Sequence, residues 1–236
     1  MPSSRADWPG RPGADRLLTT VMTRSPAAGA ASVGAVFLFW VGVFSAGPMV
    51  DGYSAREDFI SSLASRGSPV AGIGICALLA SAVAHLAAGR AVQIGWPSRL
   101  CAWSLFAAFL AGTAVAAFRQ SCPDGPARCT PVGDWVDAVH RAGVGAYEAF
   151  ALVAMVTLAV GALRGPSPWP RWLGLVSLAA AVGSLVLLAQ TNGNQPGLWQ
   201  RLWLADNHTW LLLVAATATV DAGRASYGRN RAARRA

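Results

Sequence analysis

The sequence predicts an all-α integral membrane protein, a bundle of six transmembrane helices with a short interfacial helix after the first span. Of its 236 residues, 54% are hydrophobic and only 13% are charged, whereas soluble domains carry about 25% charged residues. Six apolar stretches each approach the length of about 20 residues that crosses hydrocarbon as a helix. Arginine supplies all 19 basic residues, and it collects at the ends of these stretches and in the terminal tails.

The chain divides into a tail, a membrane domain and a second tail. Residues 1–27 are rich in Pro, Gly, Ser and Arg, which predicts a flexible cytoplasmic segment, and 221–236 form a basic cytoplasmic tail. Between them, 28–220 should hold the six spans. We expect these spans at about 28–47, 70–89, 100–118, 136–163, 172–191 and 198–220. The first could instead be a secretory signal peptide, because the small residues at 45–47 resemble a cleavage site.

The distribution of arginine predicts the orientation. If the N-terminus is inside, 13 of the 19 arginines are cytoplasmic: Arg5, Arg11, Arg16, Arg24, Arg90, Arg99, Arg164, Arg171, Arg224, Arg229, Arg231, Arg234 and Arg235. Cytoplasmic segments of membrane proteins carry such an excess, and an even number of spans then places both termini in the cytoplasm. We therefore expect a multi-pass protein of the cell membrane that contacts membrane lipids. The net charge of +8 does not indicate nucleic acid, since it follows the span ends.

The stretch DGYSAREDFISSLASRGSP at 51–69 predicts the interfacial helix. Ser54 and Glu57 stand in the S-x-x-E arrangement, in which a hydroxyl and a carboxylate cap the free amides of a helix start. Gly67 can adopt the left-handed turn that ends a helix. We expect about three turns lying in the membrane interface. The helix is either an amphipathic connector with its charges in water, or one wall of a functional site through Asp58 and Ser61.

Two further features concern packing. Ala108, Gly112 and Ala116 in the third span, and Gly145 and Ala149 in the fourth, recur at four-residue intervals, which allows helices to approach closely in lipid. The abundance of alanine in this chain is the alternative explanation.

The four cysteines divide into two kinds. Cys122 and Cys129 flank prolines and a glycine in the loop between spans three and four, and we predict a disulfide because this loop should face the oxidising exterior. The sequence contains no C-x-x-C pair, the spacing that is typical of redox catalysis. Cys76 and Cys101 lie within apolar spans and should be buried thiols.

The fourth span carries an unusual set of polar residues. Asp137 and Glu148 lie within about 20° of each other around a helix, with Arg141 between them and His140 at the edge of the same face. Glu148 lies about 16 Å further along the axis, below the outer interface. A carboxylate at that depth is costly unless it is paired or protonated, so it should face the bundle interior. The alternative is a buried ion pair that only sets helix registry.

The sixth span offers partners for this face. Arg201 and His208 are seven residues apart and so lie within about 20° on one side of the helix. We expect Arg201 or Arg141 to neutralise Glu148, and His208 to face His140. An outward-facing polar pocket should result, formed by Asp58, Ser61, Asp137, His140, Arg141, Glu148, Arg201 and His208.

Three motifs add a resemblance. They are GYSAREDFISSLASRG after the first span, the FRQSCPDG loop that leads to DAVH, and GLWQRLW at the start of the last span. On these residues the chain resembles the bacterial membrane proteins grouped as domain of unknown function 998, across about residues 30–220. The resemblance implies a compact multi-span bundle and implies no reaction.

Three functions fit these observations. The first is a non-enzymatic accessory or a small-molecule- or lipid-binding protein with an outward-facing pocket and no cofactor. The alternative is a membrane-embedded hydrolase of a lipid-like substrate, with zinc held by Asp137, His140 and His208, and with Asp58 or Glu148 as the acid or base. The second alternative is a proton-coupled transporter in which Glu148 carries the proton.

Overall fold

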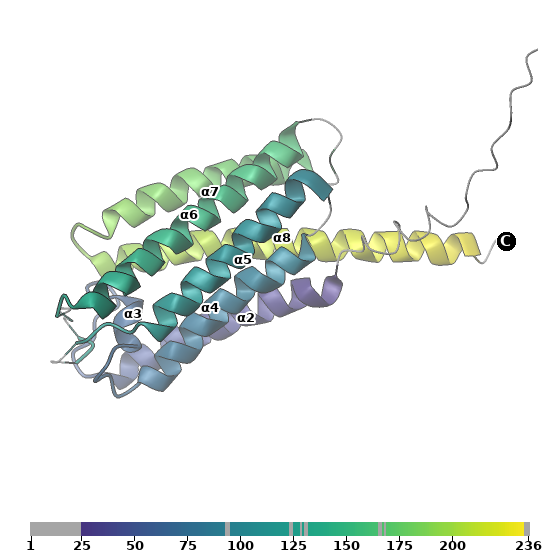
Figure 1. Cartoon of the computed structure of the whole chain (residues 1–236). Coiled ribbons are helices and arrows are strands. Elements are labelled where there is room, and N and C mark those ends of the chain that lie inside the picture. Colours follow the sequence, from purple (N-terminus) through teal and green to yellow (C-terminus); the bar gives the residue numbers. More distant parts are fainter. Residues whose placement is uncertain are drawn as a thin grey trace, which may run out of the picture.

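The computed structural model describes residues 25–92, 95–122, 125–127, 129, 132–164, 167 and 169–233, and within these ranges its regular elements are helices. Figure 1 shows long helices lying side by side, with short elements gathered at one end. The elements are α2 (Pro26–Ala46), η1 (Gly47–Met49), α3 (Ile60–Leu63), α4 (Ala71–Ala91), α5 (Gly95–Ala117), α6 (Trp135–Leu163), α7 (Arg171–Gln190) and α8 (Pro196–Ala233).

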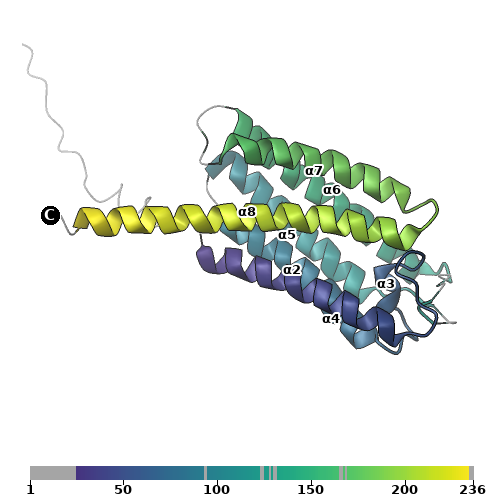
Figure 2. The ribbon, with the colours of Figure 1, turned by 180° about the vertical axis from the view of Figure 1, so that it is seen from behind.

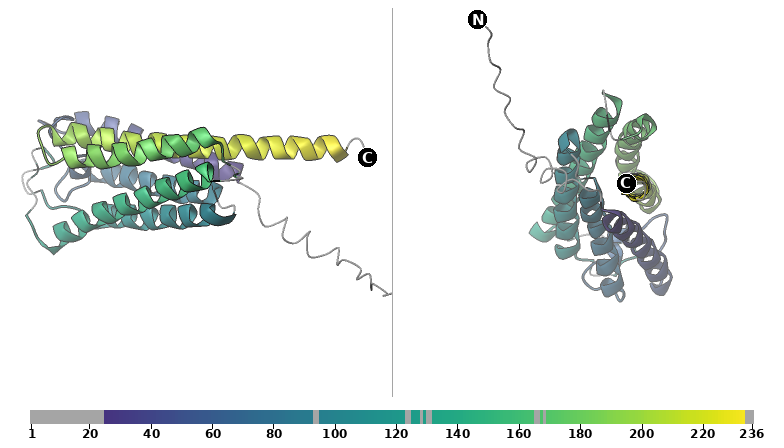
Figure 3. Two further views of the ribbon diagram at one scale, coloured as in Figure 1. Left: turned by 90° about the horizontal axis from the view of Figure 1, so that it is seen from above. Right: turned by 90° about the vertical axis from the view of Figure 1, so that its right-hand side faces the viewer.

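The six long helices form a ring in chain order. α2 packs against α4, α4 against α5, α5 against α6, α6 against α7 and α7 against α8, and α8 returns to α2. Figure 2, seen from behind, shows α8 lying between α2 and α7, and the end view in Figure 3 shows the same arrangement. Beyond the ring, α8 continues as a straight helix that projects from one end (Figure 1). This continuous helix lies where a separate basic tail was predicted from residue 221.

Five of these helices are long and apolar enough to cross a membrane within the described part of the chain. They are Pro26–Met49, Ala71–Ala91, Arg99–Ala117, Trp135–Leu163 and Arg171–Gln190. α8 is not among them, because the polar residues of its first half interrupt its apolar sequence. The all-helical fold predicted from the sequence is therefore confirmed among the described residues. Five apolar helices, where six spans were predicted, suggest a multi-pass membrane protein. The predicted tail at 1–27 lies outside the described residues up to residue 24.

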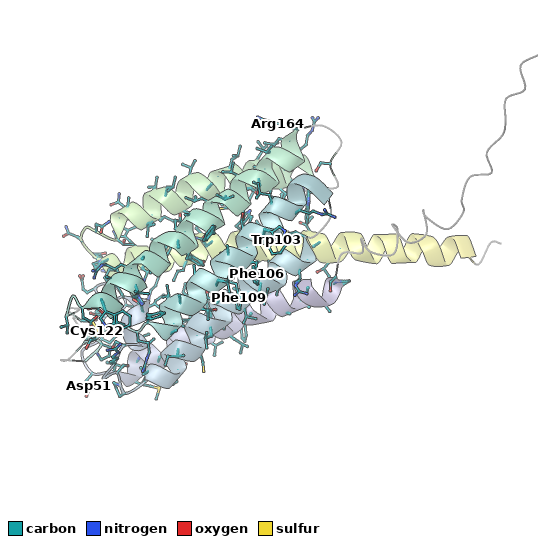
Figure 4. The ribbon with its side chains drawn as sticks, viewed as in Figure 1. Asp51, Trp103, Phe106, Phe109, Cys122 and Arg164 are labelled. Carbon is teal, nitrogen blue, oxygen red and sulfur yellow. A yellow bond between two sulfur atoms is a disulfide. The ribbon has the colours of Figure 1, made fainter. Side chains whose placement is uncertain are left out.

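The ends of the bundle are marked by turns that the sequence explains. Ser25 caps α2 by accepting from the Ala28 amide, and Pro26 occupies the first turn, where its missing N–H costs nothing. Asp134 caps α6 by accepting from the Asp137 amide at 2.9 Å. Figure 4 shows Asp51 and Cys122 at one end of the bundle and Arg164 at the other. We call these the Asp51 end and the Arg164 end.

Small residues bring particular backbones together. A Cβ on Gly74 of α4 would lie 2.6–2.8 Å from the backbone of Leu63 and Ala64, so only glycine lets the α3 turn rest on α4. Gly112 contacts Ala82 across the α4–α5 interface, as expected from the spacing in the third span. Gly145 was expected to pack closely in the same way in α6, but a Cβ added there would meet no atom within 4 Å. Ala149 is exposed.

The connection between η1 and α4 differs from the predicted three-turn helix. The Ser54 hydroxyl does accept from the Glu57 amide, but the carboxylate that reaches back to the Ser54 amide belongs to Asp58, at 2.7 Å. Phe59 is extended, so the chain leaves the helical path after one turn and only the four-residue α3 follows. All four residues of α3 are buried beneath the end of the ring.

The second loop at the Asp51 end is joined to this connection. The Arg66 amide donates to the Gln120 carbonyl at 2.9 Å, in a single parallel bridge between Arg66 and Ser121. Cys122 and Cys129 form the predicted disulfide, with their Cα atoms 5.1 Å apart. Of the other two cysteines, Cys101 is buried as expected, whereas Cys76 is exposed.

Three groups of buried hydrophobic side chains are found among the described residues, and the smallest consists of Ala46, Val50, Leu63 and Val70 at the Asp51 end. The group toward the Arg164 end is built around Leu105, Met155, Leu158, Trp210 and Leu211, all of them nearly inaccessible. A second, smaller group toward the Asp51 end includes Phe39, Ile60, Tyr147 and Trp203. The apolar part of the core therefore lies deep in the ring, and polar chemistry is concentrated at the Asp51 end.

Candidate functional site

Arg201, near the start of α8, joins the connection between η1 and α3 to the bundle. Its Nη1 donates to the carbonyl oxygens of Asp58 and Gly197, each at 2.9 Å. Its Nη2 donates to the hydroxyl of Tyr53 at 2.6 Å, and that hydroxyl donates onward to the Phe59 carbonyl at 3.1 Å. The Asp58 carbonyl, next to the extended backbone at Phe59, is thus bound by Arg201, which acts as a positioning residue.

Two more contacts complete this joint. A Cβ on Gly197 would overlap the backbone of Asp58, so the backbones of the α8 start and the connection are in direct contact. The Ile60 amide donates to Oε1 of Gln200 at 2.6 Å. Burial raises the pKa of Tyr53 above its ordinary value of 10.0, an effect that the neighbouring Arg201 charge partly offsets.

A pocket of about 420 Å³ opens at the Asp51 end, between the connection and the ends of α5, α6, α7 and α8. This volume is within the range of about 300–1,000 Å³ that is typical of small-molecule sites. Phe59 and Trp203 contribute apolar walls. The polar lining comes from Ser61, Gln120, His140, Arg141, Thr191, Asn192 and Gln200.

The tautomer of His140 is set by its surroundings. Its Nδ1 lies 2.9 Å from the Phe118 carbonyl oxygen and 3.2 Å from that of Val115. Carbonyl oxygens only accept hydrogen bonds, so in the neutral ring the proton is on Nδ1 and Nε2 keeps its lone pair. The ring lines the pocket and is only 3% exposed, so it is held rigidly.

The side-chain amides of the two pocket glutamines are oriented by the hydrogen bonds that their Oε1 atoms accept. Oε1 of Gln200 accepts from the Ile60 amide, which can only donate. Oε1 of Gln120 accepts from the Ser61 hydroxyl at 3.3 Å. Within the described residues neither NH₂ group has a hydrogen-bond acceptor, so each is available as a donor in the pocket. Arg141, exposed at the pocket wall, adds a positive charge.

Asp137 lies beneath the pocket and has a structural role. It is fully buried, and its carboxylate accepts from the amides of Gly133 at 2.7 Å and Ser121 at 3.3 Å. Carboxylates that accept backbone amides are well stabilised as anions. Asp137 thereby joins both ends of the loop between α5 and α6 to the start of α6, and it is not among the residues that line the pocket.

A smaller cavity of about 50 Å³ continues from the pocket toward the bundle centre. The two spaces share Ser61, Val144, Gln200 and Trp203 as lining residues, so they adjoin. The wall of the inner cavity is mostly apolar, and a volume of this size can hold a few water molecules or a small apolar group.

Ser81 and Tyr147 are the polar groups that lead from the inner cavity into the ring. The Tyr147 hydroxyl lies 3.0 Å from Nε2 of His85, whose Nδ1 lies 2.8 Å from the Ser81 carbonyl oxygen. The proton of neutral His85 is therefore on Nδ1, and Tyr147 donates to Nε2. The Ser81 hydroxyl lies 2.9 Å from Nε2 of His208. A hydrogen-bonded chain thus connects α6, α4 and α8.

Glu148 lies behind Trp203 and is only 4% exposed. Ser184 of α7 donates to its Oε1 at 2.8 Å, and the indole N–H of Trp203 donates to its Oε2 at 3.0 Å. Asn207 supports this arrangement by donating to the Ser184 hydroxyl at 2.9 Å. Both carboxylate oxygens are therefore met by neutral donors.

The structure places the eight predicted pocket residues in three groups. Ser61, His140 and Arg141 line the pocket itself. Asp58 and Arg201 belong to the joint below the connection, and Asp137 fastens the outer loop. Glu148 and His208 lie deeper, in the two buried networks.

The expected pairings are also different from those found. The guanidinium of Arg201 donates to carbonyls and to Tyr53, and neutral donors bind Glu148 in place of the expected arginine. The centroid of the His208 ring lies 6.3 Å from that of His85, and Nε2 of His208 contacts the Ser81 hydroxyl. His208 therefore has other neighbours than the expected His140. Helical spacing indicated correctly which face of its helix each residue occupies. The position of the side chain along the bundle axis decided which residue it contacts.

The zinc set considered from the sequence is not assembled. His140 binds carbonyls of α5, His208 binds Ser81, and Asp137 binds loop amides. Among the described residues, no three histidine, cysteine, aspartate or glutamate side chains form a group that could hold a metal ion.

Several functional side chains escaped the sequence reasoning. Trp203 and Gln200 stand in the GLWQRLW motif, but neither was placed in the predicted pocket. Tyr147 precedes Glu148 directly. Ser184 is a polar residue inside an apolar span, which is itself a sign of a contact between helices. Attention to uncharged polar residues would have found these four.

Comparison with known proteins gives one match. The family described as "Protein of unknown function (DUF998)" matches residues 33–217, a range that begins in α2 and ends in α8. This confirms the resemblance carried by the three motifs, and the range includes the whole pocket. No curated protein and no solved structure matches the chain.

Proposed function

From the premise that the chain belongs to the DUF998 family of proteins of unknown function, we propose that it is a multi-pass membrane protein that binds a small amphiphilic anion in the pocket at its Asp51 end. The role is one of binding and requires no metal or other cofactor.

One observation carries this proposal: the pocket has an excess of hydrogen-bond donors. The oxygens of Gln120 and Gln200 are occupied by protein donors, which leaves their NH₂ groups for a ligand. Arg141 adds a guanidinium, which suits carboxylate and phosphate groups because its donors form a planar fork. A ligand that satisfies these groups must be rich in acceptors and negatively charged.

The remaining walls indicate the rest of the ligand. Phe59, Val144, Leu188 and Trp203 face the same pocket, and the adjoining inner cavity is mostly apolar. A short hydrocarbon group attached to the anion would bury apolar surface there, with a gain of about 25 cal/mol per Å². Nε2 of His140 keeps its lone pair and is one acceptor that a ligand hydroxyl could use.

We further propose that α8 is a sixth crossing and that both termini are cytoplasmic. Its polar side chains Asn207 and His208 are buried against the ring, which is the orientation that a membrane helix requires. The arginine distribution favours the Arg164 end as the cytoplasmic one in the cell membrane. The connection at 51–69 would then lie at the outer interface and the pocket would open outward.

Lipid contact follows from the same placement. Large apolar side chains cover the outside of the ring, among them Phe37, Leu38, Phe44, Trp103 and Leu185, and each is more than half exposed. Lipid acyl chains would cover these groups, since exposed apolar surface of this extent is unfavourable in water.

Calorimetric titration of the purified protein with two anionic probes tests the proposal. Hexanoate represents a free carboxylate, and dihexanoyl phosphatidylglycerol represents a lipid headgroup. Hexanamide and dihexanoyl phosphatidylcholine are the matched uncharged and zwitterionic controls. We expect at least one anionic probe to bind in preference to its control, and Arg141→Gln to weaken that binding about tenfold, as expected for loss of a charged hydrogen bond.

Arg164→Gln is the matched variant, because Arg164 is exposed at the opposite end. It should leave the affinity unchanged. Equal binding of charged probes and their controls, or equal losses in the two arginine variants, would refute the proposed ligand class. Preference for one anionic probe over the other decides whether the natural ligand is a free anion or a lipid.

A further inference from the structure

Glu148 has no cationic partner although it lies deep within the ring. Its two oxygens accept from Ser184 and Trp203, both neutral, and within the described residues no arginine or histidine forms an ion pair with it. Burial of an isolated carboxylate is very unfavourable, and such groups take up a counterion or a proton.

The neighbouring helices carry few groups that could neutralise it. On α8, Arg201 is bound to the connection at the Asp51 end, His208 is bound to Ser81, and Asp206 is a second acid that packs over Gly183 of α7. On α4, His85 is turned toward Tyr147. The remaining ionisable groups of α5 and α7 within the described residues are at their starts, near the Arg164 end: Arg99, Cys101 and Arg171.

Asp206 strengthens this conclusion. Its Oδ2 is buried and has no hydrogen-bond partner, and the same is true of Oδ1 of its neighbour Asn207, which is 1% exposed. The region around Glu148 therefore holds two acids and unpaired acceptors, but no cation. Burial without a counterion favours the neutral form of a carboxyl group, so a proton is the ligand that such a site lacks. The Ser184 and Trp203 donors act in the opposite direction, because they stabilise the ionised form.

We propose that Glu148 is a proton-binding site and that its protonation is linked to anion binding in the pocket through Trp203. Trp203 contacts both sites directly. Its indole N–H donates to Glu148, and its side chain lines both the pocket and the inner cavity. The proton comes from the outer solution, and the balance is one H⁺ taken up by the Glu148 carboxylate. The linkage, but not the proton site, rests on the proposed function.

The sign of the linkage follows from charge. An ionised Glu148 repels an anion held on the other side of Trp203, and protonation removes that repulsion. By reciprocity, anion binding favours protonation of Glu148 by the same factor. Anion affinity should therefore rise as the pH falls. Protonation of His140 would act in the same direction, so the pH dependence alone does not identify the group.

Glu148→Gln separates the two groups because glutamine imitates the protonated acid. We expect this variant to bind the anionic probe at pH about 8 as tightly as the unaltered protein binds it at pH about 6, a gain of about tenfold if the interaction is worth one pH unit of linkage. A merely structural role for Glu148 predicts a loss of affinity instead. Glu57→Gln is the matched control, because Glu57 is the other glutamate of the chain and is exposed.

Infrared difference spectroscopy tests the proton site without any ligand. Among the carboxylic acid C=O bands recorded between low and high pH, one component should be absent in Glu148→Gln and present in Glu57→Gln and Trp203→Phe. If Glu148→Gln keeps every such band, the proton site is refuted. If the band is lost but the variant shows no gain in anion affinity at high pH, the linkage is refuted. If the unaltered protein binds neither anionic probe, the proposed function and the linkage fail together, and the infrared result still decides the proton site.

Discussion

The indole N–H of Trp203 lies 3.0 Å from Oε2 of Glu148, and the ring of the same tryptophan forms a wall of the pocket. A single side chain on α8 thus separates the binding space from a buried carboxylate on α6. The Ser184 hydroxyl, at 3.0 Å from the same indole nitrogen, completes a triangle that holds the three helices together.

Trp203→Phe should destabilise the protein. The substitution keeps an aromatic ring but removes the donor, which leaves Oε2 of Glu148 without that partner, and loss of one partner of a buried charged group costs about 1–3 kcal/mol. Trp103→Phe is the matched control, since Trp103 is 65% exposed on α5 (Figure 4). Thermal unfolding in detergent would measure both variants, and equal shifts would contradict the role of the indole.

Gly197→Ala should disrupt the joint between α8 and the connection. A Cβ at this position meets the backbone of Asp58, which cannot move aside as a flexible side chain could. We expect a loss of stability of about 1–3 kcal/mol, typical of overpacking. Gly34→Ala in α2 should be neutral or slightly stabilising, because nothing lies within 4 Å of that Cβ. Protease cleavage of the 51–63 segment would rise in the first variant only, and unchanged cleavage would argue against this contact.

The buried hydroxyl of Tyr53 should make the stability of the folded protein depend on pH in the alkaline range. Burial raises the pKa of its hydroxyl in the folded protein above the unfolded value of 10.0. A raised folded pKa contributes stability that is fully present below pH about 10 and is lost as the pH rises toward the folded value. Tyr53→Phe removes this contribution together with one acceptor of Arg201. The variant should be less stable at neutral pH and lose less stability between pH about 9 and 11 than the unaltered chain. Parallel pH curves of the melting temperature would show that Tyr53 does not titrate in this way.

The orientation can be measured with single cysteines. In a chain whose own four cysteines are replaced, Asp51→Cys should react in intact cells with a thiol reagent that does not cross membranes, and Arg164→Cys should react only after lysis. The reason is that the two positions lie at opposite ends of the bundle, and the proposed orientation places the Arg164 end in the cytoplasm. Labelling of Arg164→Cys in intact cells would reverse the topology.

Sequence patterns were most reliable where one physical requirement dominates. The long apolar stretches predicted the helices of the ring, because a helix in hydrocarbon needs length and low polarity. Cys122 and Cys129 were paired correctly, because they are only seven positions apart in the chain. The start signal at Ser54 was also real, but the helix ends after one turn, where Phe59 is extended and the Asp58 carbonyl accepts from Arg201.

The membership of the pocket could be predicted only in part. His140 and Arg141 were found from their place on a polar helix face, whereas Glu148, on the same face, lies behind Trp203. Angular position around a helix is set by residue spacing, but depth and partner depend on which neighbouring helix lies there. The donor character of the pocket rests on Gln120 and Gln200, whose orientation is decided by contacts with α3.

The sequence by itself determined that this chain is a helical, multi-pass bundle with polar groups concentrated near one end, because hydrophobicity, helical period and arginine placement are local properties of the chain. Only the tertiary structure decided that Arg201 fastens a loop, that neutral donors surround Glu148, and that Trp203 stands between the carboxylate and the pocket. These are contacts between residues far apart in the chain, and their distances exist only once the ring has closed.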